Sequence, residues 1–384
     1  MPGAQPAAGA PVTLADHLIR RIGGEGPLRL STFMGEALGH PTLGYYTTRD
    51  PLGAAGDFTT APEISQMFGE LLGLWCAQAW LTLGSPTPVH LVELGPGRGT
   101  LMADALRAMA RTPGLTASLR VHMVETSPSL RARQRTTLAA LPATAQPPHP
   151  ITWADSLEAV PEGPLLLLAN EFFDALPIRQ MQKTARGWAE RCVTWDTAEK
   201  RFAWALDATG GAELLVPPDL RGAPEGAVVE LCPAALTVAG EIGRRLAAHP
   251  GAALVVDYGY DAPSLGDTLQ AVRGHAYAAV LDDPGQADLT AHVDFRTLAA
   301  TAVAAGAAAH GIVDQGALLR RLGIAQRAAT LKRNATAVQA HAVDLALDRL
   351  TSPDQMGRLF KALALTSPGA PPPAGFEPSE GRSP

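Results

Sequence analysis

The sequence predicts an α/β fold, a doubly wound sheet with helices on both faces, from three observations. A buried-strand pattern at residues 89–94 runs through a glycine-rich turn into a helical pattern at residues 100–111. The alternation returns at residues 120–125, followed by a helix that Ser127 caps, and at the apolar run of residues 165–169. Strongly apolar strands that alternate with helices are typical of a parallel sheet covered on both sides.

Further elements flank this pattern. Residues 151–153 form a short third strand, and a helix over residues 234–248 followed by a strand over 252–258 resumes the α/β alternation. Between residues 179 and 217 the hydrophobic pattern changes to an alternation with a period of two residues, as at residues 188–195. This alternation predicts an antiparallel β insertion.

The N-terminal part is predicted to be helical. Apolar residues recur at helical spacing in two helices between Thr13 and His40, with Thr13 and Ser31 placed to cap them. A polar, glycine-bearing loop over residues 44–61 precedes one long apolar helix over residues 63–83.

The chain should therefore divide into six segments. The last is rich in Pro, Gly, Ser and Glu and has only Phe376 to bury, which predicts disorder. In chain order we expect a disordered lead-in (residues 1–12), a helical segment with a lid loop (13–85) and the first part of the α/β core (86–178). The β insertion (179–224), the remaining core with substrate-side elements (225–366) and a disordered tail (367–384) follow.

Composition and charge limit the possible functions. The 384 residues are 46% hydrophobic and 18% charged, which is typical of globular proteins, and no apolar run reaches the roughly 18 residues of a membrane span. A net charge of −6 without a basic stripe argues against nucleic-acid binding. Three widely spaced cysteines fit neither a disulfide framework nor a zinc site, so we expect no metal.

The first residues lack both an apolar signal region and an Arg-rich transit pattern. Arginine greatly outnumbers lysine and alanine is abundant, as in GC-rich bacterial genomes. We therefore expect a cytoplasmic bacterial protein. No feature of the sequence indicates the oligomeric state.

The glycine turn after the first core strand is the strongest functional motif. Glu93, Gly95, Gly97 and Gly99 lie between that strand and the next helix, where free backbone N–H groups and absent side chains let an extended, charged ligand approach the chain. A dinucleotide-binding motif would place glycine at position 100, but Thr100 stands there, so S-adenosylmethionine is the favoured ligand over NAD.

Polar residues after the next two strands support a nucleoside site. Glu125 ends the second strand, where a carboxylate can accept both ribose hydroxyls, and Asp155 and Ser156 follow the third, where adenine would lie. The alternative is that the glycines make only a tight turn and that Glu125 is an exposed strand end.

The sequence also resembles a known family, the mitochondrial dysfunction protein A family of class I methyltransferases. The resemblance extends in order over residues 14–361. The matching segments are residues 56–66, 93–100, 170–177, 256–260 and 288–295.

This resemblance implies a Rossmann-like core and a protein arginine methyltransferase, whose mitochondrial relatives modify a core quinone-module subunit of respiratory complex I. Asn170, Glu171 and Asp174 leave the carboxyl end of the central strand, which faces the ligand crevice in such sheets. Asn170 would contact the cofactor. Glu171 and Asp174 would hold a substrate guanidinium, because its planar fork of donors pairs with carboxylates. Alternatively, Glu171 is a helix N-terminal acid and Asp174 a cap.

Other candidate residues have equally plausible structural roles. Thr59, Thr60 and Glu63 could reach the methyl donor, or Thr60 could form a capping box with Glu63. His292 and Asp294 are substrate-side candidates that a turn explains equally well.

Tyr258 is a possible rim residue. Of Phe172 and Phe173, one could wall the donor pocket while the other packs in the core, and neither is assigned a catalytic role. Two further functions stay open, a cofactor-binding assembly factor that acts by holding its partner, and a small-molecule methyltransferase.

Overall fold

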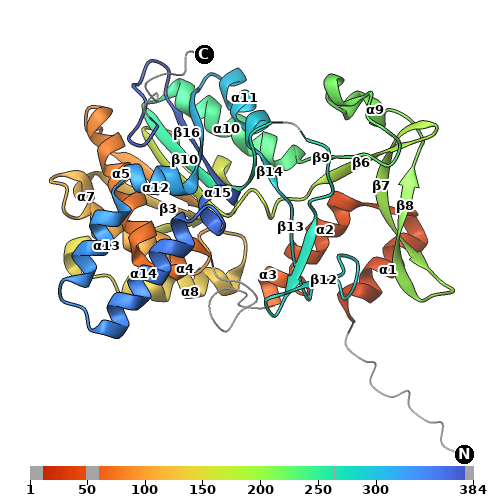
Figure 1. Cartoon of the computed structure of the whole chain (residues 1–384), viewed down its shortest axis with the longest axis horizontal. Helices are drawn as coiled ribbons and strands as arrows, with labels where there is room; N and C mark the ends of the chain where they lie inside the picture. Colours follow the sequence, from red (N-terminus) through yellow and green to blue (C-terminus); the bar gives the residue numbers. More distant parts are fainter. Residues whose placement is uncertain (1–11, 49–59, 263, 377–384) are drawn as a thin grey trace, which may run out of the picture.

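The computed structural model describes residues 12–48, 60–262 and 264–376. Its centre is an eight-stranded sheet in the order β15-β16-β10-β5-β2-β3-β4, with β14 paired to β10 (Figure 1). Strands β10, β5, β2, β3 and β4 are mutually parallel, whereas β16 lies antiparallel between β10 and β15. The strands are β2 (Val89–Leu94), β3 (Leu119–Val124), β4 (Thr152–Ala154), β5 (Leu165–Asn170), β10 (Gly251–Tyr260), β14 (Val293–Asp294), β15 (Ala308–Asp314) and β16 (Phe360–Thr366).

Helices cover both faces of this sheet, which confirms the predicted doubly wound α/β fold. Side chains that alternate along β2 and β5 point into two separate clusters, one under each layer of helices. One layer contains α5 (Gln66–Thr82), α6 (Thr100–Met109), α12 (Gln315–Arg321), α13 (Ile324–Lys332) and α14 (Ala337–Thr351), and the other contains α10 (Pro233–Ala248) and α11 (Phe295–Ala304).

Close packing of α5 on α6 depends on two glycines. A Cβ added to Gly73 would lie 2.6 Å from the Cα of Ala105, and one added to Gly69 would lie 2.6 Å from the Cβ of Asp104. The predicted single helix over residues 63–83 is interrupted. A short α4 (Ala61–Ile64) ends before Ser65, whose hydroxyl accepts a hydrogen bond from the N–H of Met67 and starts α5.

A second, antiparallel sheet of five strands contains the predicted insertion. The insertion extends beyond residue 224, where it was predicted to end, because β9 pairs with β6. The two N-terminal helices lie beside this sheet (Figure 1). Phe33 on the second helix packs edge to face against Phe202 of the sheet. The elements are α1 (Leu14–Glu25), β1 (Leu28–Arg29), α2 (Leu30–Gly39), β6 (Arg179–Thr184), β7 (Gly187–Asp196), β8 (Arg201–Asp207), α9 (Ala212–Leu215) and β9 (Val228–Leu231).

Two of the three expected helix caps are present. Thr13 forms a capping box with Asp16, and Ser127 accepts from the N–H of Leu130. The expectation for Ser31 is wrong, since α2 already begins at Leu30, where β1 pairing with β7 ends.

A third sheet of three strands was not foreseen, and its β13 reaches the cavity described below. It contains β11 (Gln270–Arg273), β12 (Ala276–Ala278) and β13 (Asp288–Thr290). The remaining helices are α3 (Tyr45–Thr48), α7 (Leu115–Ser118), α8 (Pro128–Ala139) and α15 (Met356–Leu359).

The expected disordered tail is wrong for residues 367–376. The N–H of Ser367 donates to the carbonyl of Gly251, and Phe376 is only 6% exposed, with its ring against Gly311. The Phe376 ring, together with the hydrogen bond from Arg321 to the carbonyl of Gly375, fastens this proline-rich segment to the core. Residues 377–384 and the lead-in up to residue 11 lie outside the described part of the chain.

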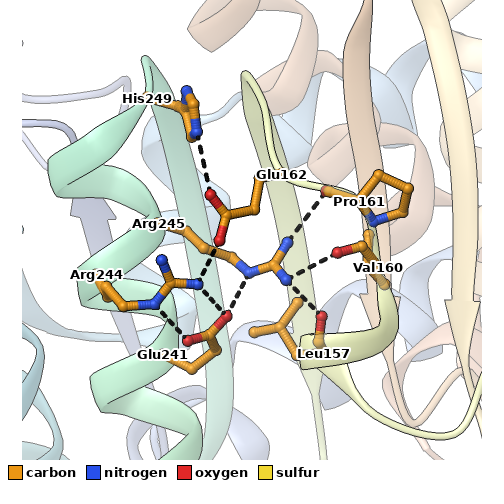
Figure 2. A network of polar contacts seen from close by, with 8 residues as sticks. All are labelled: Leu157, Val160, Pro161, Glu162, Glu241, Arg244, Arg245 and His249. Atoms are coloured by element: carbon orange, nitrogen blue, oxygen red, sulfur yellow. Dashed lines mark hydrogen bonds and ion pairs between the residues drawn. The ribbon is translucent and has the colours of Figure 1, made fainter.

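A buried arginine holds the loop after β4 against α10 (Figure 2). The guanidinium of Arg245 is 3% exposed, and it donates to the carbonyls of Leu157 (2.8 Å), Val160 (2.8 Å) and Pro161 (3.2 Å) and to Glu241 (2.6 Å). Each of these carbonyls would cost about 1–3 kcal/mol if left unpaired. The network fixes the segment that directly follows Asp155 and Ser156.

Among the described residues, no helix has both the length and the apolar character needed to cross a bilayer.

Candidate functional site

A cavity of about 710 Å³ opens at the carboxyl ends of β2, β3, β5 and β10. The chain leaves β2 toward β3 and β4 on one side and returns to β5 on the other, so the cavity lies where the strand order reverses. Ligands of open α/β sheets bind at such points. Its volume is in the range of small-molecule sites.

The glycine turn forms one wall. Gly95, Gly97 and Gly99 have φ angles of +60°, +50° and +80°, and Gly99 is the N-cap of α6. A Cβ on Gly95 would lie 2.9 Å from the ring of Phe172. Left-handed backbone at all three positions explains why the turn requires glycine.

Glu93 lies beneath this turn and lines the cavity, although it is 3% exposed. Burial raises its pKa well above the usual range, and the N–H of Met102 partly offsets this by donating to it. Its Oε2 has no hydrogen-bond partner within the described residues. The side chain is thus a buried polar group available to a ligand.

Glu125 lines the cavity at the end of β3. Its carboxylate accepts from the N–H of Ser127 (2.8 Å) and from Nε2 of Gln134 (3.2 Å), while Gln134 also donates to the carbonyl of Gly97 (2.8 Å). Burial raises its pKa despite these bonds. Glu125 and the glycine turn are therefore held in one arrangement by Gln134.

Asp155 and Ser156 also line the cavity, as expected from the sequence. The side chain of Asp155 is 82% exposed and pairs with Arg131 at 2.6 Å, so it lies at the outer edge. Ser156 precedes the short 3₁₀ turn Leu157–Ala159 that Arg245 holds.

Thr60 lines the cavity as the N-cap of α4, but its side chain makes no capping hydrogen bond. The alternative of a capping box with Glu63 is wrong, because Glu63 instead accepts from the hydroxyl of Thr100 at 2.5 Å. Thr59 lies outside the described residues.

The turn after β5 brings three polar side chains to the cavity. Asn170 is 8% exposed, and its Oδ1 has no partner within the described chain. The Oε1 of Glu171 accepts from the N–H of Ala61 (3.0 Å) and from Nδ2 of Asn170 (3.1 Å). Oδ1 of Asp174 is also unpartnered among the described residues. Neither acid fits its structural alternative: no helix begins at Glu171, and Asp174 caps none.

Burial dominates the electrostatics of these acids. It raises the pKa of Glu171 to about 7, with a smaller contribution from the negative charge of Asp174. It raises the pKa of Asp174 to about 6, although a hydrogen bond with the Tyr258 side chain opposes the shift. Both carboxyls therefore change charge near neutral pH.

Three residues at the site were not predicted. Asp257 lies on β10 behind the turn, and the hydroxyl of Tyr46 donates to Asp288 at 2.7 Å, both of which line the cavity. A lone acid within the apolar run of residues 252–258 was the available signal for Asp257. Tyr46 and Asp288 are 242 residues apart, and no local pattern connects them.

Not all of the predicted substrate-side residues line the cavity. Tyr258 and His292 line the cavity, and their rings meet edge to face at 5.4 Å. Asp294 does not line it. Its carboxylate caps α11 by accepting from the N–H (3.0 Å) and the hydroxyl (2.6 Å) of Thr297, which supports the turn alternative.

One group of possible metal ligands lies away from the cavity, formed by His17, Glu36 and His40. Nδ1 of His40 accepts from the N–H groups of Thr42 and Leu43, which leaves the proton of a neutral ring on Nε2. Glu36 pairs with Arg21 at 2.7 Å. Neither the His40 ring nor the Glu36 carboxylate is therefore arranged as a free ligand for a metal ion.

Comparisons with known proteins agree with this site. A profile of the family described as S-adenosyl-L-methionine-dependent methyltransferase matches residues 71–313, more than half of the chain. The chain belongs to this family and is a methyltransferase whose methyl donor is S-adenosylmethionine. The unpartnered oxygens of Glu93 and Asn170 and the left-handed glycine turn fit such a ligand, with Glu125 placed for its ribose.

Within the family, the chain is similar to mitochondrial protein arginine methyltransferase NDUFAF7. It is 40% identical to the Mus musculus protein, over 94% of this chain and 86% of that protein, and 38% identical to the Homo sapiens protein, over 94% and 85%. A crystal structure from Burkholderia thailandensis, bound to S-adenosyl-homocysteine, superposes with a TM-score of 0.83 at 31% identity and 94% coverage of both chains. These findings confirm the family resemblance.

One expectation is contradicted. The sequence led us to expect a bacterial cytoplasmic protein, but the Mus musculus, Danio rerio and Homo sapiens relatives are named mitochondrial proteins. Composition was a poor guide, because the ratio of arginine to lysine reflects codon usage and not location.

Glu125→Ala is expected to weaken S-adenosyl-homocysteine binding by about 1.5–3 kcal/mol, because it removes a charged acceptor for ribose hydroxyls. This corresponds to about 10- to 150-fold in Kd by isothermal titration calorimetry. The half-buried acid Asp196 lies on β7 outside the cavity, so Asp196→Ala serves as the control. An unchanged Kd in Glu125→Ala would give this residue a purely structural role.

Proposed function

We propose that this methyltransferase acts on an arginine side chain of a polypeptide. The observation that supports this most strongly is the pair of buried carboxyls, Glu171 and Asp174, beside the cofactor cavity. A guanidinium is a planar fork of donors with a positive charge, and two carboxylates can bind and orient it. Aligning one nitrogen of that fork is most of what the reaction requires of the protein.

Charge also fits. The raised pKa values of Glu171 and Asp174 show that burial disfavours two negative charges in the free site. A bound guanidinium lowers both values, so that the acids become carboxylates when substrate arrives.

Bound S-adenosylmethionine supplies a methyl group on a positive sulfur. As the substrate nitrogen forms its bond to carbon, the carbon–sulfur bond breaks and the nitrogen loses one proton. Glu171 or Asp174 accepts this proton at a carboxylate oxygen. Acids with pKa values near 6–7 suit this role, since they can then return the proton to water.

The names of the relatives and the family resemblance support a more specific partner. The relatives are named protein arginine methyltransferases, and by resemblance the substrate is a core quinone-module subunit of respiratory complex I. The N-terminal helices and the inserted sheet add protein beyond the methyltransferase core, which suits a polypeptide better than a small molecule.

The test uses donor carrying a deuterated methyl group, the purified protein, and peptides that tile the quinone-module subunits. Mass spectrometry should find the label on arginine. Matched peptides with lysine in place of that arginine should stay unlabelled, because a point charge cannot replace the bidentate fork. Label on another residue type or only on a small molecule would contradict the proposal.

A further inference from the structure

Asp257 is fully buried, 0% exposed, in the last half of strand β10, which pairs with β5. Its Oδ2 accepts from the N–H groups of Phe173 (3.0 Å) and Asp174 (3.2 Å), and its Oδ1 accepts from the N–H of Tyr258 (2.9 Å). One side chain therefore ties the turn after β5 to the end of β10.

This tie fixes the position of Asp174. The N–H of Asp174 donates to Asp257, and its carbonyl accepts from the N–H of Ala291 at 3.0 Å, so the backbone is held from two sides. The carboxyl itself keeps one oxygen, Oδ1, without a partner among the described residues. It is therefore buried and positioned, yet free to bind.

The charges around Asp257 do not neutralise it. Lys361 is its neighbour on β16, but the ammonium binds Asp314 (2.7 Å) and the carbonyl of Arg358 (2.8 Å). Burial and the negative charges of Asp174 and Glu171 raise the pKa of Asp257 well above its usual range. The other titratable groups that act on this cluster are Tyr258 on β10, Arg349 on α14, and Tyr46 with Asp288 across the cavity.

We propose that Asp257 is a positioning residue for the arginine site, which holds the turn that carries Asp174 and shares one proton with Asp174 in the free protein. The inference rests on the arginine methyltransferase function proposed above. Two adjacent buried carboxyls without a cation cannot both be charged at little cost, so the pair retains a proton until guanidinium arrives.

An activity-independent titration tests the shared proton. In protein labelled with ¹³Cγ-aspartate, the wild type should show one aspartate carboxyl that titrates well above the ordinary range. This upper step should shift toward lower pH in both Asp257→Asn and Asp174→Asn, because either change removes the repulsion between the two acids while burial still raises the pKa of the acid that remains. The control Asp294→Asn alters a helix cap outside the cavity and should leave the step in place. An unshifted step in Asp257→Asn would overturn the proposal.

Kinetics test the positioning role. Asp257→Asn replaces one of the two accepting oxygens by an NH₂ group, which then opposes at least one backbone N–H donor. This should displace the turn and lower kcat for the arginine peptide about 100-fold, more than it raises KM. Binding of S-adenosyl-homocysteine should change little. Turnover equal to that of Asp294→Asn would contradict the role.

Two further outcomes remain decisive. If wild-type protein methylates no arginine, the proposed function fails, but the titration still decides whether the two acids share a proton. If Asp257→Asn does not fold, Asp174→Asn tests the pair from the other side, where a shift of the upper step toward lower pH supports the proposal and an unshifted step overturns it.

Discussion

Glu171→Gln is expected to slow methyl transfer to arginine about 1,000-fold, because it keeps the size of the side chain but removes the charge that pairs with guanidinium and accepts the proton. The remaining side-chain oxygen can still accept from the N–H of Ala61. Cofactor binding should therefore change little. Single-turnover methylation measures the first quantity, and calorimetry with S-adenosyl-homocysteine measures the second.

Asp174→Asn should behave similarly, and the double variant should lose less than the two single losses combined, since both acids serve one bound group. The control is Glu230→Gln, which changes another acid of raised pKa that does not line the cavity. The wild-type rate should rise with pH between about 6 and 7, as the two acids ionise. Near-normal turnover in Glu171→Gln would show that other residues bind the guanidinium and accept its proton.

The second large effect is expected from Gly97→Val, which should weaken S-adenosyl-homocysteine binding by at least about 100-fold. Gly97 has a φ of +50° and lines the cavity. A branched side chain there both strains the backbone, by about 1–2 kcal/mol, and occupies space where ligand meets the chain.

Gly84→Val separates these two effects. Gly84 also has a left-handed φ, +83°, but a Cβ there meets nothing within 4 Å, and the residue lies outside the cavity. Both variants should lose comparable stability in urea unfolding, whereas only Gly97→Val should lose the cofactor. Normal calorimetric binding by Gly97→Val would show that the turn does not contact the ligand.

The α/β core could be predicted because its signals are local. An apolar run such as residues 165–169 can only be a central strand, and the turn at Gly95, Gly97 and Gly99 lies between two strong patterns. The cofactor wall follows from the same rule, since strand ends such as Glu125 meet at one edge of the sheet.

The missed features depend on contacts between distant segments. Asp257 acts on a turn 83 residues earlier. The packing of the N-terminal helices on the inserted sheet leaves no periodic trace in either sequence. Asp294 was ambiguous for another reason, since a carboxylate that caps a helix and one that binds substrate have the same sequence neighbours.

The backbone at Glu171 has a consequence for the evolution of this site. Its φ of +50° is left-handed, and burial of its carboxyl raises the pKa, so the residue is costly to the fold on two counts. Glycine there would relax the backbone and remove the desolvated carboxyl at the loss of the hydrogen bonds that it accepts from Ala61 and Asn170. Selection for stability alone would thus disfavour this acid, and the catalytic role proposed for Glu171 has to offset that cost.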